Sequence, residues 1–346
     1  MNYLLMITFA FAISYFLTPL VGWIAVKLNI LDQPGERKVH VAATPRIGGI
    51  AIYVSFLIMF YLAHNMGFFT KGFENEFKGL LIGGLIVFIT GLIDDIWGLK
   101  PILKLLGQTI AALVLVFNGV SISLFIVNPI VSSVITVLWV VGITNAFNLL
   151  DNMDGLSAGV AVIAALMFFV VYSRQGVVDL NILMVILMGS IIGFLRFNLN
   201  PARIFMGDAG ALFIGFIIAG TSCMGSYLKG SLMTHLPVIT PILILSVPIF
   251  DTFSVIYIRM RSRISIFAAD KRHFSHRLVR LGMTNKQAVL FIYLVSFCVG
   301  LGAILLPRIK IVDAFIILIQ SLAIFAIIVV LMVFQADELK RKIKNK

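Results

Sequence analysis

The chain has 346 residues, of which 60% are hydrophobic and only 12% are charged. This composition excludes an ordinary soluble domain, in which about a quarter of the residues are charged, and it indicates an integral membrane protein. The net charge of +12 does not indicate a nucleic-acid-binding protein, because the lysines and arginines fall in short gaps between apolar runs.

Eleven apolar runs follow one another along the chain, and a membrane-spanning helix needs about 20 such residues. The runs are 3–26, 47–63, 79–93, 102–117, 131–143, 156–172, 180–195, 209–227, 236–258, 288–306 and 312–334. The third and fifth runs are short and need a tilt or flanking residues to cross a bilayer. Cys223 and Cys298 lie inside such runs, so we expect them to pack as small apolar residues rather than form disulfides. We predict one all-α membrane domain over residues 1–346.

The basic residues predict how this domain is oriented. Most of the 27 lysines and arginines share one side of the membrane when the N-terminus is placed outside, and loops rich in basic residues face the cytoplasm. The C-terminus is then cytoplasmic. The cytoplasmic loops of this arrangement lie near residues 27–46, 94–104, 144–155, 196–208 and 259–286. Six acids fall on the same side, although the arrangement was not fitted to them: Asp94, Asp95, Asp151, Asp154, Asp208 and Asp270.

Two adjacent acids, Asp94 and Asp95, end the third run, and Lys104 follows them after Pro101. Acids at the end of a helix are often only solvated, or they cap the next helix. Two adjacent carboxylates also suit a divalent cation or a general base, with Lys104 within reach of an anion. Both interpretations remain open for this pair taken alone.

The segment 145–155 carries two carboxylates and three carboxamides between two apolar runs. Asn148, Asp151 and Asp154 are spaced by three, which places them on one face of a helix if the helix continues that far. A capping role for the next helix accounts for Asp154 alone. A polar face at a membrane boundary suits oxygen ligands for Mg²⁺, or hydrogen-bond partners for a nucleobase and ribose.

The segment 205–210 reads Phe-Met-Gly-Asp-Ala-Gly and precedes the eighth run. In one interpretation Asp208 caps that helix and the glycines shape a turn. In the other, the glycines let a ligand approach the backbone, the helix N-terminus attracts a phosphate, and Asp208 holds a cation there.

The long loop 259–286 combines arginines with two histidines. We assign Arg259, Arg261 and Arg263 to ordinary basic charge next to anionic lipid. His273 and His276 differ, because orientation in the membrane requires lysine and arginine but not histidine. Together with Lys271, Arg272 and Arg277 they form a predicted clamp for a diphosphate.

Taken together, the Asp94-Asp95 pair, the 148–155 segment, the 205–208 segment and the 273–277 loop resemble the polyprenyl-phosphate N-acetylhexosamine-1-phosphate transferase family. The loop 270–273, Asp-Lys-Arg-His, is similar to the branch that uses UDP-GlcNAc and undecaprenyl phosphate. The peptidoglycan branch typically has three consecutive histidines here. The usual His-x-His-His pattern reads His-Phe-Ser-His at 273–276, so the middle imidazole is absent.

The resemblance also implies roles for single residues. Asp208 and Asn148 would bind Mg²⁺, with Mn²⁺ as an alternative, while Asp154 would contact the uracil and Phe205 would stack on it. The remaining implied contacts are with the lipid phosphate, the diphosphate or the sugar. They belong to Asp94, Asp95, Lys104, His273, His276 and Arg277, and Asp151 and Lys38 match family positions without an assigned role. The implied catalytic residues are Asp94, Asp95, Asp208 and His273.

The implied activity is transfer of GlcNAc-1-phosphate from UDP-GlcNAc to undecaprenyl phosphate at the cytoplasmic face of a bacterial inner membrane, releasing UMP and initiating a cell-envelope glycan. The partners are then a UDP-sugar, a polyprenyl phosphate and the membrane, without nucleic acid, and a homodimer is compatible with them. One alternative is the same chemistry with another UDP-sugar, such as UDP-MurNAc-pentapeptide. A second is a secondary transporter, for which only Asp251 has the expected place inside a span.

Overall fold

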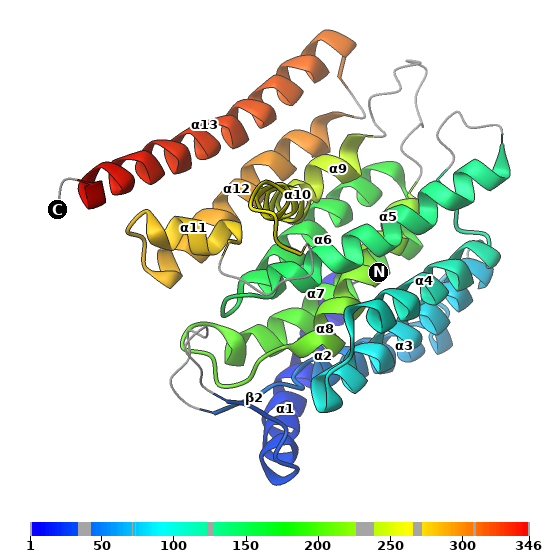
Figure 1. Cartoon of the computed structure of the whole chain (residues 1–346). Helices are drawn as coiled ribbons and strands as arrows, with labels where there is room; N and C mark the ends of the chain where they lie inside the picture. Colours follow the sequence, from blue (N-terminus) through cyan, green and yellow to red (C-terminus); the bar gives the residue numbers. More distant parts are fainter. Residues whose placement is uncertain are drawn as a thin grey trace. The chain divides into compact units, whose positions relative to one another are not determined.

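A computed structural model of the chain describes residues 2–33, 43–70, 72, 74–122, 128–225, 239–265, 272–306 and 309–344. Figure 1 shows that the described chain is almost entirely helical. It divides into two compact units, Met1–Ser226 and Tyr227–Lys346, here called unit 1 and unit 2. The prediction of one domain stays a prediction, and each unit is described by itself.

Unit 1 contains eight helices and a short β-ribbon in its described part. The helices are α1 (Tyr3–Lys27), α2 (Gly49–Asn65), α3 (Glu74–Trp97), α4 (Pro101–Phe117), α5 (Pro129–Leu150), α6 (Leu156–Gln175), α7 (Val178–Asn198) and α8 (Gly207–Met224). The ribbon pairs β1 (Leu31–Asp32) antiparallel with β2 (Thr44–Pro45), in the register Leu31 to Pro45.

Helix α8 lies in the interior of unit 1, where it packs against α2, α3, α5 and α6 (Figure 1). Small residues bring these helices close together. A Cβ atom added to Gly91 of α3 would collide with the backbone of Ala209 in α8, and one added to Gly215 of α8 would lie 2.9 Å from Thr144 Cα of α5. Such contacts stabilise helix packing in membranes, where hydrophobic burial alone gives little preference for one neighbour over another.

Unit 2 is built around α12 (Asn285–Leu305) in its described part. This helix begins with a capping box formed by Thr284 and Gln287, which satisfies two backbone N–H groups. Around it pack α9 (Thr240–Ile244), α10 (Ser246–Arg261), α11 (Phe274–Arg280) and α13 (Ile311–Lys344).

The structure is that of an all-α polytopic membrane protein. Among the described residues, eight helices are long and apolar enough to cross a bilayer, and α2 and α4 are shorter apolar helices of 17 residues. At 1.5 Å per residue such a helix is about 26 Å long, close to the ~30 Å hydrocarbon core. The predicted run 236–258 is divided at Leu245 between α9 and α10. The count of eleven spans and the orientation therefore stay predictions.

The two predicted runs that were too short are extended by their polar neighbours. Helix α3 has 24 residues and α5 has 22, because both continue beyond their apolar stretches. The side chain of Asn128 accepts a hydrogen bond from Ile130 N at 2.9 Å and so begins α5 before its apolar part. At the other end, α5 includes Asn145 and Asn148.

Candidate active site

The centre of the candidate site in unit 1 is the ammonium group of Lys104. It lies 3.1 Å from Asp94 Oδ2 and also contacts Asp208 Oδ2. Asp94 lies near the end of α3, Lys104 in the first turn of α4 and Asp208 in the first turn of α8. Asp94 Oδ1 accepts a hydrogen bond of 2.7 Å from Leu99 N, which closes the turn between α3 and α4. The turn therefore places Lys104 between two carboxylates contributed by two other helices.

Asp95 has a different environment from its neighbour. Its two carboxylate oxygens accept hydrogen bonds from the backbone N–H groups of Asp208 at 2.9 Å and Ala209 at 3.0 Å, and Arg46 Nη2 lies 3.2 Å from Oδ1. The side chain is completely buried. Asp95 is thus the anion at the N-terminus of α8, where helix backbone groups favour negative charge. These two N–H groups are not free for a phosphate, contrary to that interpretation of the segment 205–210.

The glycines of this segment serve helix packing. Gly207 has a φ of +71°, which side-chain-bearing residues rarely adopt, and a Cβ there would collide with Arg46 O and the Asp95 carboxylate. A Cβ on Gly210 would lie 2.8 Å from Gly49 Cα of α2. The backbone is therefore kept clear for neighbouring segments of the protein, and the expected approach of a ligand to these glycines is not needed to explain them.

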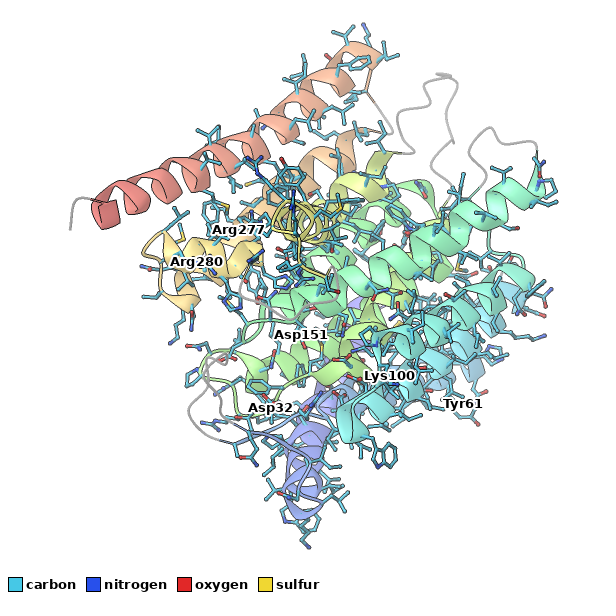
Figure 2. All side chains as sticks on the ribbon, in the orientation of Figure 1. Asp32, Tyr61, Lys100, Asp151, Arg277 and Arg280 are labelled. Carbon is cyan, nitrogen blue, oxygen red and sulfur yellow. The ribbon has the colours of Figure 1, made fainter. Side chains whose placement is uncertain are left out.

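Asp151 adds a further acid to the site. It is the C-cap of α5, which ends at Leu150, and it is labelled in Figure 2. Burial raises the pKa of Asp151 well above its usual range, and the charges of Asp208, Asp95 and Asp154 raise it further. We call Asp94, Asp95, Asp151, Asp208 and Lys104 the carboxylate cluster. It holds more negative than positive groups.

The prediction that Asn148, Asp151 and Asp154 share one helical face is wrong, because only Asn148 lies within the helix. Because α5 ends at Leu150, Asp154 lies in the turn that leads to α6. It does not cap α6, whose N-cap Gly155 makes no side-chain capping bond. Instead, Asp154 Oδ2 accepts hydrogen bonds from Asn200 Nδ2 at 2.8 Å and from Ala202 N at 3.1 Å.

Asn198 ties the same two turns together. Its side chain is buried, accepts a hydrogen bond from Gly155 N at 3.0 Å and donates one to Ile204 O at 2.9 Å. The next residue, Phe205, donates from its backbone N to Pro45 O at 2.7 Å and accepts from Gly48 N at 2.9 Å. The backbone of Phe205 therefore lies where the turns after α7 and β2 meet.

Asn145 and Asn148 lie about one turn apart on α5, and their side chains differ in their contacts. Asn145 exchanges side-chain hydrogen bonds with the buried Gln108 of α4, which explains this carboxamide as a link between two helices. Asn148 is half-buried, and its side chain makes no hydrogen bond to a residue that the structure describes. Its assignment as a metal ligand stays a prediction.

The histidine loop belongs to unit 2. His273 Nδ1 lies 2.8 Å from Asp251 Oδ2, and Arg277 donates a hydrogen bond to Ser254 Oγ of α10. Burial lowers the pKa of the Arg277 guanidinium, whereas the charge of Asp251 raises it. Figure 2 labels Arg277 on α11, where His276 is half-buried. The predicted meeting of this loop with the carboxylate cluster stays a prediction, because the two units are described separately.

Sequence reasoning missed three residues of these networks, namely Arg46, Asn198 and Asn200, and it considered Asp251 only for a transporter. Arg46 counted only as a basic residue in a loop. The two asparagines carry the same signal that singled out the segment 145–155, carboxamides at a membrane boundary. Lys38, which matched a family position, lies outside the described residues.

Comparison with known proteins places this site in a family. The model of "Glycosyl transferase family 4" matches residues 77–226, which include the whole carboxylate cluster. The chain is 38% identical over 298 residues to a probable undecaprenyl-phosphate N-acetylglucosaminyl 1-phosphate transferase of Bacillus subtilis, covering 84% of this chain and 81% of the relative.

Two further relatives carry related names. A decaprenyl-phosphate N-acetylglucosaminephosphotransferase of Mycobacterium leprae is 35% identical over 319 residues, covering 84% of this chain and 80% of the relative. An undecaprenyl-phosphate alpha-N-acetylglucosaminyl 1-phosphate transferase of Thermotoga maritima is 29% identical over 309 residues, covering 83% and 92%. The similarity therefore extends over most of both chains.

Proposed function

We propose a complete reaction for this chain, which belongs to the polyprenyl-phosphate N-acetylhexosamine-1-phosphate transferase family. The chain is a multi-span membrane phosphoglycosyl transferase that transfers GlcNAc-1-phosphate to a polyprenyl phosphate. The finer proposal is that the donor is UDP-GlcNAc, the acceptor is undecaprenyl phosphate and the leaving group is UMP. We place the reaction at the cytoplasmic face of a bacterial inner membrane, where it initiates a lipid-linked envelope glycan.

The observation that carries the proposal is the position of Lys104 between Asp94 and Asp208, with Asp151 beside them. Transfer of a phosphoryl group between two anionic substrates depends on charge neutralisation and in-line positioning more than on covalent help. A lysine held by carboxylates from different helices is preorganised for such a task. Its place among the ends of apolar helices also suits a lipid acceptor, whose phosphate lies at the membrane surface.

We assign different roles to Asp94 and Asp95, for which the family resemblance implied a joint one. Both oxygens of Asp95 are bound to the N-terminus of α8, so this residue supports the site. Asp94 shares Lys104 with Asp208 and is the acid we assign to the acceptor phosphate. A phosphate monoester has a second pKa of about 6, so it is largely ionised at neutral pH and needs orientation more than deprotonation.

The donor set of the cluster fits Mg²⁺, and Mn²⁺ as its replacement. Among the described residues no group of three or more His, Cys, Asp or Glu side chains has the arrangement of a complete protein-only metal site. Mg²⁺ does not require one, since it keeps several waters and binds through one or two carboxylates plus substrate phosphates. The surplus of acids around Asp151 favours an added cation. Asp208 and Asn148 would hold it, and it would neutralise charge on the diphosphate.

The uridine is proposed to bind at the turns after α5 and α7. One oxygen of Asp154 is held by Asn200 and Ala202, which leaves Oδ1 as an acceptor for a uracil N–H group. Phe205 lies on a backbone that is fixed by Pro45 and would stack on the base. A base recognised by both a hydrogen bond and a ring contact accounts for the choice of a uridine nucleotide.

The diphosphate and the sugar are assigned to Lys38, His273, His276 and Arg277. These side chains are positively charged or can become so, and charge-assisted hydrogen bonds to phosphate are among the strongest in proteins. The transporter alternative rested on Asp251 alone. That acid is bound to His273 in the structure, so Asp251 does not support a transporter as an isolated charge within a span.

The test is a donor panel with the full-length protein in lipid nanodiscs. UDP-GlcNAc, UDP-GalNAc and UDP-MurNAc-pentapeptide are each supplied with undecaprenyl phosphate and Mg²⁺, and the lipid product is identified by mass. We expect a GlcNAc-diphosphate-lipid product and one equivalent of UMP from UDP-GlcNAc. Product from UDP-MurNAc-pentapeptide instead would correct the donor, and UMP release without a lipid product would contradict the reaction. Decaprenyl phosphate as a second acceptor tests the chain length.

A further inference from the structure

We propose that Asp251 is a positioning residue, which fixes the His273 ring through Nδ1 so that Nε2 is the nitrogen presented to the diphosphate of the sugar nucleotide. This inference rests on the proposed function, which assigns His273 to the diphosphate. Asp251 itself touches no substrate and acts through the histidine.

The hydrogen bonds of Asp251 account for its burial. Its side chain is only 1% exposed, within a helix that the sequence predicts as part of a membrane span. A buried carboxylate is strongly unfavourable unless it is paired. Asp251 Oδ2 lies 2.8 Å from His273 Nδ1, and Oδ1 accepts a hydrogen bond from Phe274 N. Both oxygens are therefore used by two consecutive residues at the start of α11.

These contacts determine which ring nitrogen carries a proton. An ionised carboxylate accepts hydrogen bonds and donates none, so the hydrogen bond to Asp251 requires a proton on Nδ1 of His273. Nε2 makes no hydrogen bond to a residue that the structure describes. It is the nitrogen that remains for a ligand.

The surroundings hold the ring in this orientation. Phe274 is fully buried, and its ring packs edge-on against Phe250 at a centroid distance of 5.4 Å. One turn after Asp251, Ser254 Oγ donates to Asp251 O at 3.0 Å and accepts from Arg277. Asp251 and Ser254 of α10 thus fix His273 and Arg277, respectively. His273 is the N-cap of α11, and Arg277 lies four residues further along the chain. The positions of these two proposed diphosphate ligands are therefore set by contacts with α10 and not by the 273–277 loop alone.

Replacement of Asp251 by asparagine is predicted to move the proton of the neutral His273 ring from Nδ1 to Nε2. The backbone N–H of Phe274 can only donate, so it would take the amide oxygen. The amide NH₂ would then face His273 Nδ1, which would have to accept, and the proton would move to Nε2. The variant changes which ring nitrogen is protonated with almost no change in side-chain volume, so it separates orientation from packing.

The direct test is nitrogen NMR of the full-length protein labelled with ¹⁵N-histidine in detergent, with the His273 signal assigned by its loss in His273→Gln. We expect Nδ1 of His273 to be protonated in the unsubstituted protein and unprotonated in Asp251→Asn. An unprotonated Nδ1 in the unsubstituted protein would overturn the proposal. The measurement on the unsubstituted protein needs neither turnover nor a folded Asp251 variant, so its outcome is independent of the proposed function.

The second test is a double-mutant cycle on transfer from UDP-GlcNAc. We expect Asp251→Asn to lower kcat/KM by about 10- to 100-fold, the effect that is usual when a carboxylate behind a metal-binding histidine is removed. In the His273→Gln background the same change should cost less than about threefold, because the residue through which Asp251 acts is gone. Equal losses in both backgrounds would overturn the proposal.

A matched control is Asp179→Asn in unit 1. Asp179 is also 1% exposed and accepts a hydrogen bond of 2.8 Å from a loop residue, Thr70 N, but it has no place in the carboxylate cluster or the histidine loop. We expect its kcat/KM to stay within about threefold of that of the unsubstituted protein, whereas a loss as large as that of Asp251→Asn would mean that any buried carboxylate has this effect and would count against the proposal.

Discussion

The side chain of Asp95 on α3 accepts a hydrogen bond of 2.9 Å from the backbone N–H of Asp208 on α8. Asp95 therefore holds in place the helix that carries Asp208. Asp94, the adjacent residue, contacts Lys104 instead. The two acids are consecutive in the chain, yet Asp95 anchors α8 whereas Asp94 contacts the ammonium group of the cluster.

We therefore predict that Asp95→Ala and Asp94→Ala fail in different ways. Loss of the Asp95 carboxylate leaves two buried N–H groups unpaired, and each such group costs about 1–3 kcal/mol. The free energy of unfolding and the melting temperature in detergent should fall together with activity. Asp94→Ala should lose activity with a smaller fall in melting temperature, because it removes one backbone hydrogen bond, that of Leu99 N, instead of two. Equal melting temperatures for the two variants would contradict this division.

Lys104→Met should lower kcat by about 100-fold or more, because removal of a preorganised group that stabilises transition-state charge typically costs that much. Lys104→Arg keeps the charge but not the geometry, and we expect partial activity from it. Both are measured by release of UMP at saturating donor. Full activity of Lys104→Met would remove the lysine from the mechanism.

The metal assignment predicts that chelation by EDTA stops the transfer and that added Mg²⁺ or Mn²⁺ restores it. Asp208→Asn keeps the side-chain volume but removes a charged ligand, so a higher Mg²⁺ concentration should be needed for half-maximal activity. A binding readout that needs no turnover is the stabilisation of the protein by Mn²⁺ in a thermal-shift assay. An equal Mn²⁺-induced shift in Asp208→Asn would argue against this ligand.

The raised pKa of Asp151 predicts a pH dependence of stability in the absence of metal. The folded protein then holds a proton that the unfolded chain releases, so stability falls as the pH rises from the ordinary aspartate value of about 3.9 to the raised value. Asp151→Asn should remove this fall. In EDTA we expect the variant to melt higher than the unsubstituted protein at neutral pH and at a similar temperature near pH 4. A constant difference across this range would contradict the shift.

Asn200→Ala tests the uridine site through a residue that the sequence did not single out. The change removes one hydrogen bond that holds Asp154, worth about 1 kcal/mol, and each 1.4 kcal/mol is tenfold in affinity. We expect the KM for UDP-GlcNAc to rise several-fold with kcat largely unchanged. An unchanged KM would mean that Asp154 needs no such support.

The sequence was sufficient for the helical membrane architecture because apolar runs are local signals. It also singled out Asp94, Lys104 and Asp208, which the structure brings into contact. Helix ends were less accurate, since α5 carries the polar Asn145 and Asn148 as part of its last turns. Local pattern could not tell that this polar stretch remains helical until Leu150.

Contacts between distant segments could not be predicted from local pattern. The bond from Asp95 to Ala209 joins residues 114 positions apart, and the bond from Asp251 to His273 crosses 22 positions. Neither separation follows a helical or strand period, so neither contact could be predicted from a repeat in the sequence. Asp251 nevertheless carried one usable sign, because an acid within an apolar run requires a partner.

The close approach of Gly91 to Ala209 bears on how this protein tolerates mutation. Gly91 lies one turn before Asp94 and Asp95, and any side chain there would push α3 away from the helix that carries Asp208. A screen of random variants for loss of activity should therefore recover Gly91→Ala, which adds a single methyl group and changes no charge. The placement of the acids in the site therefore depends on a residue that has no side chain and takes no part in the chemistry.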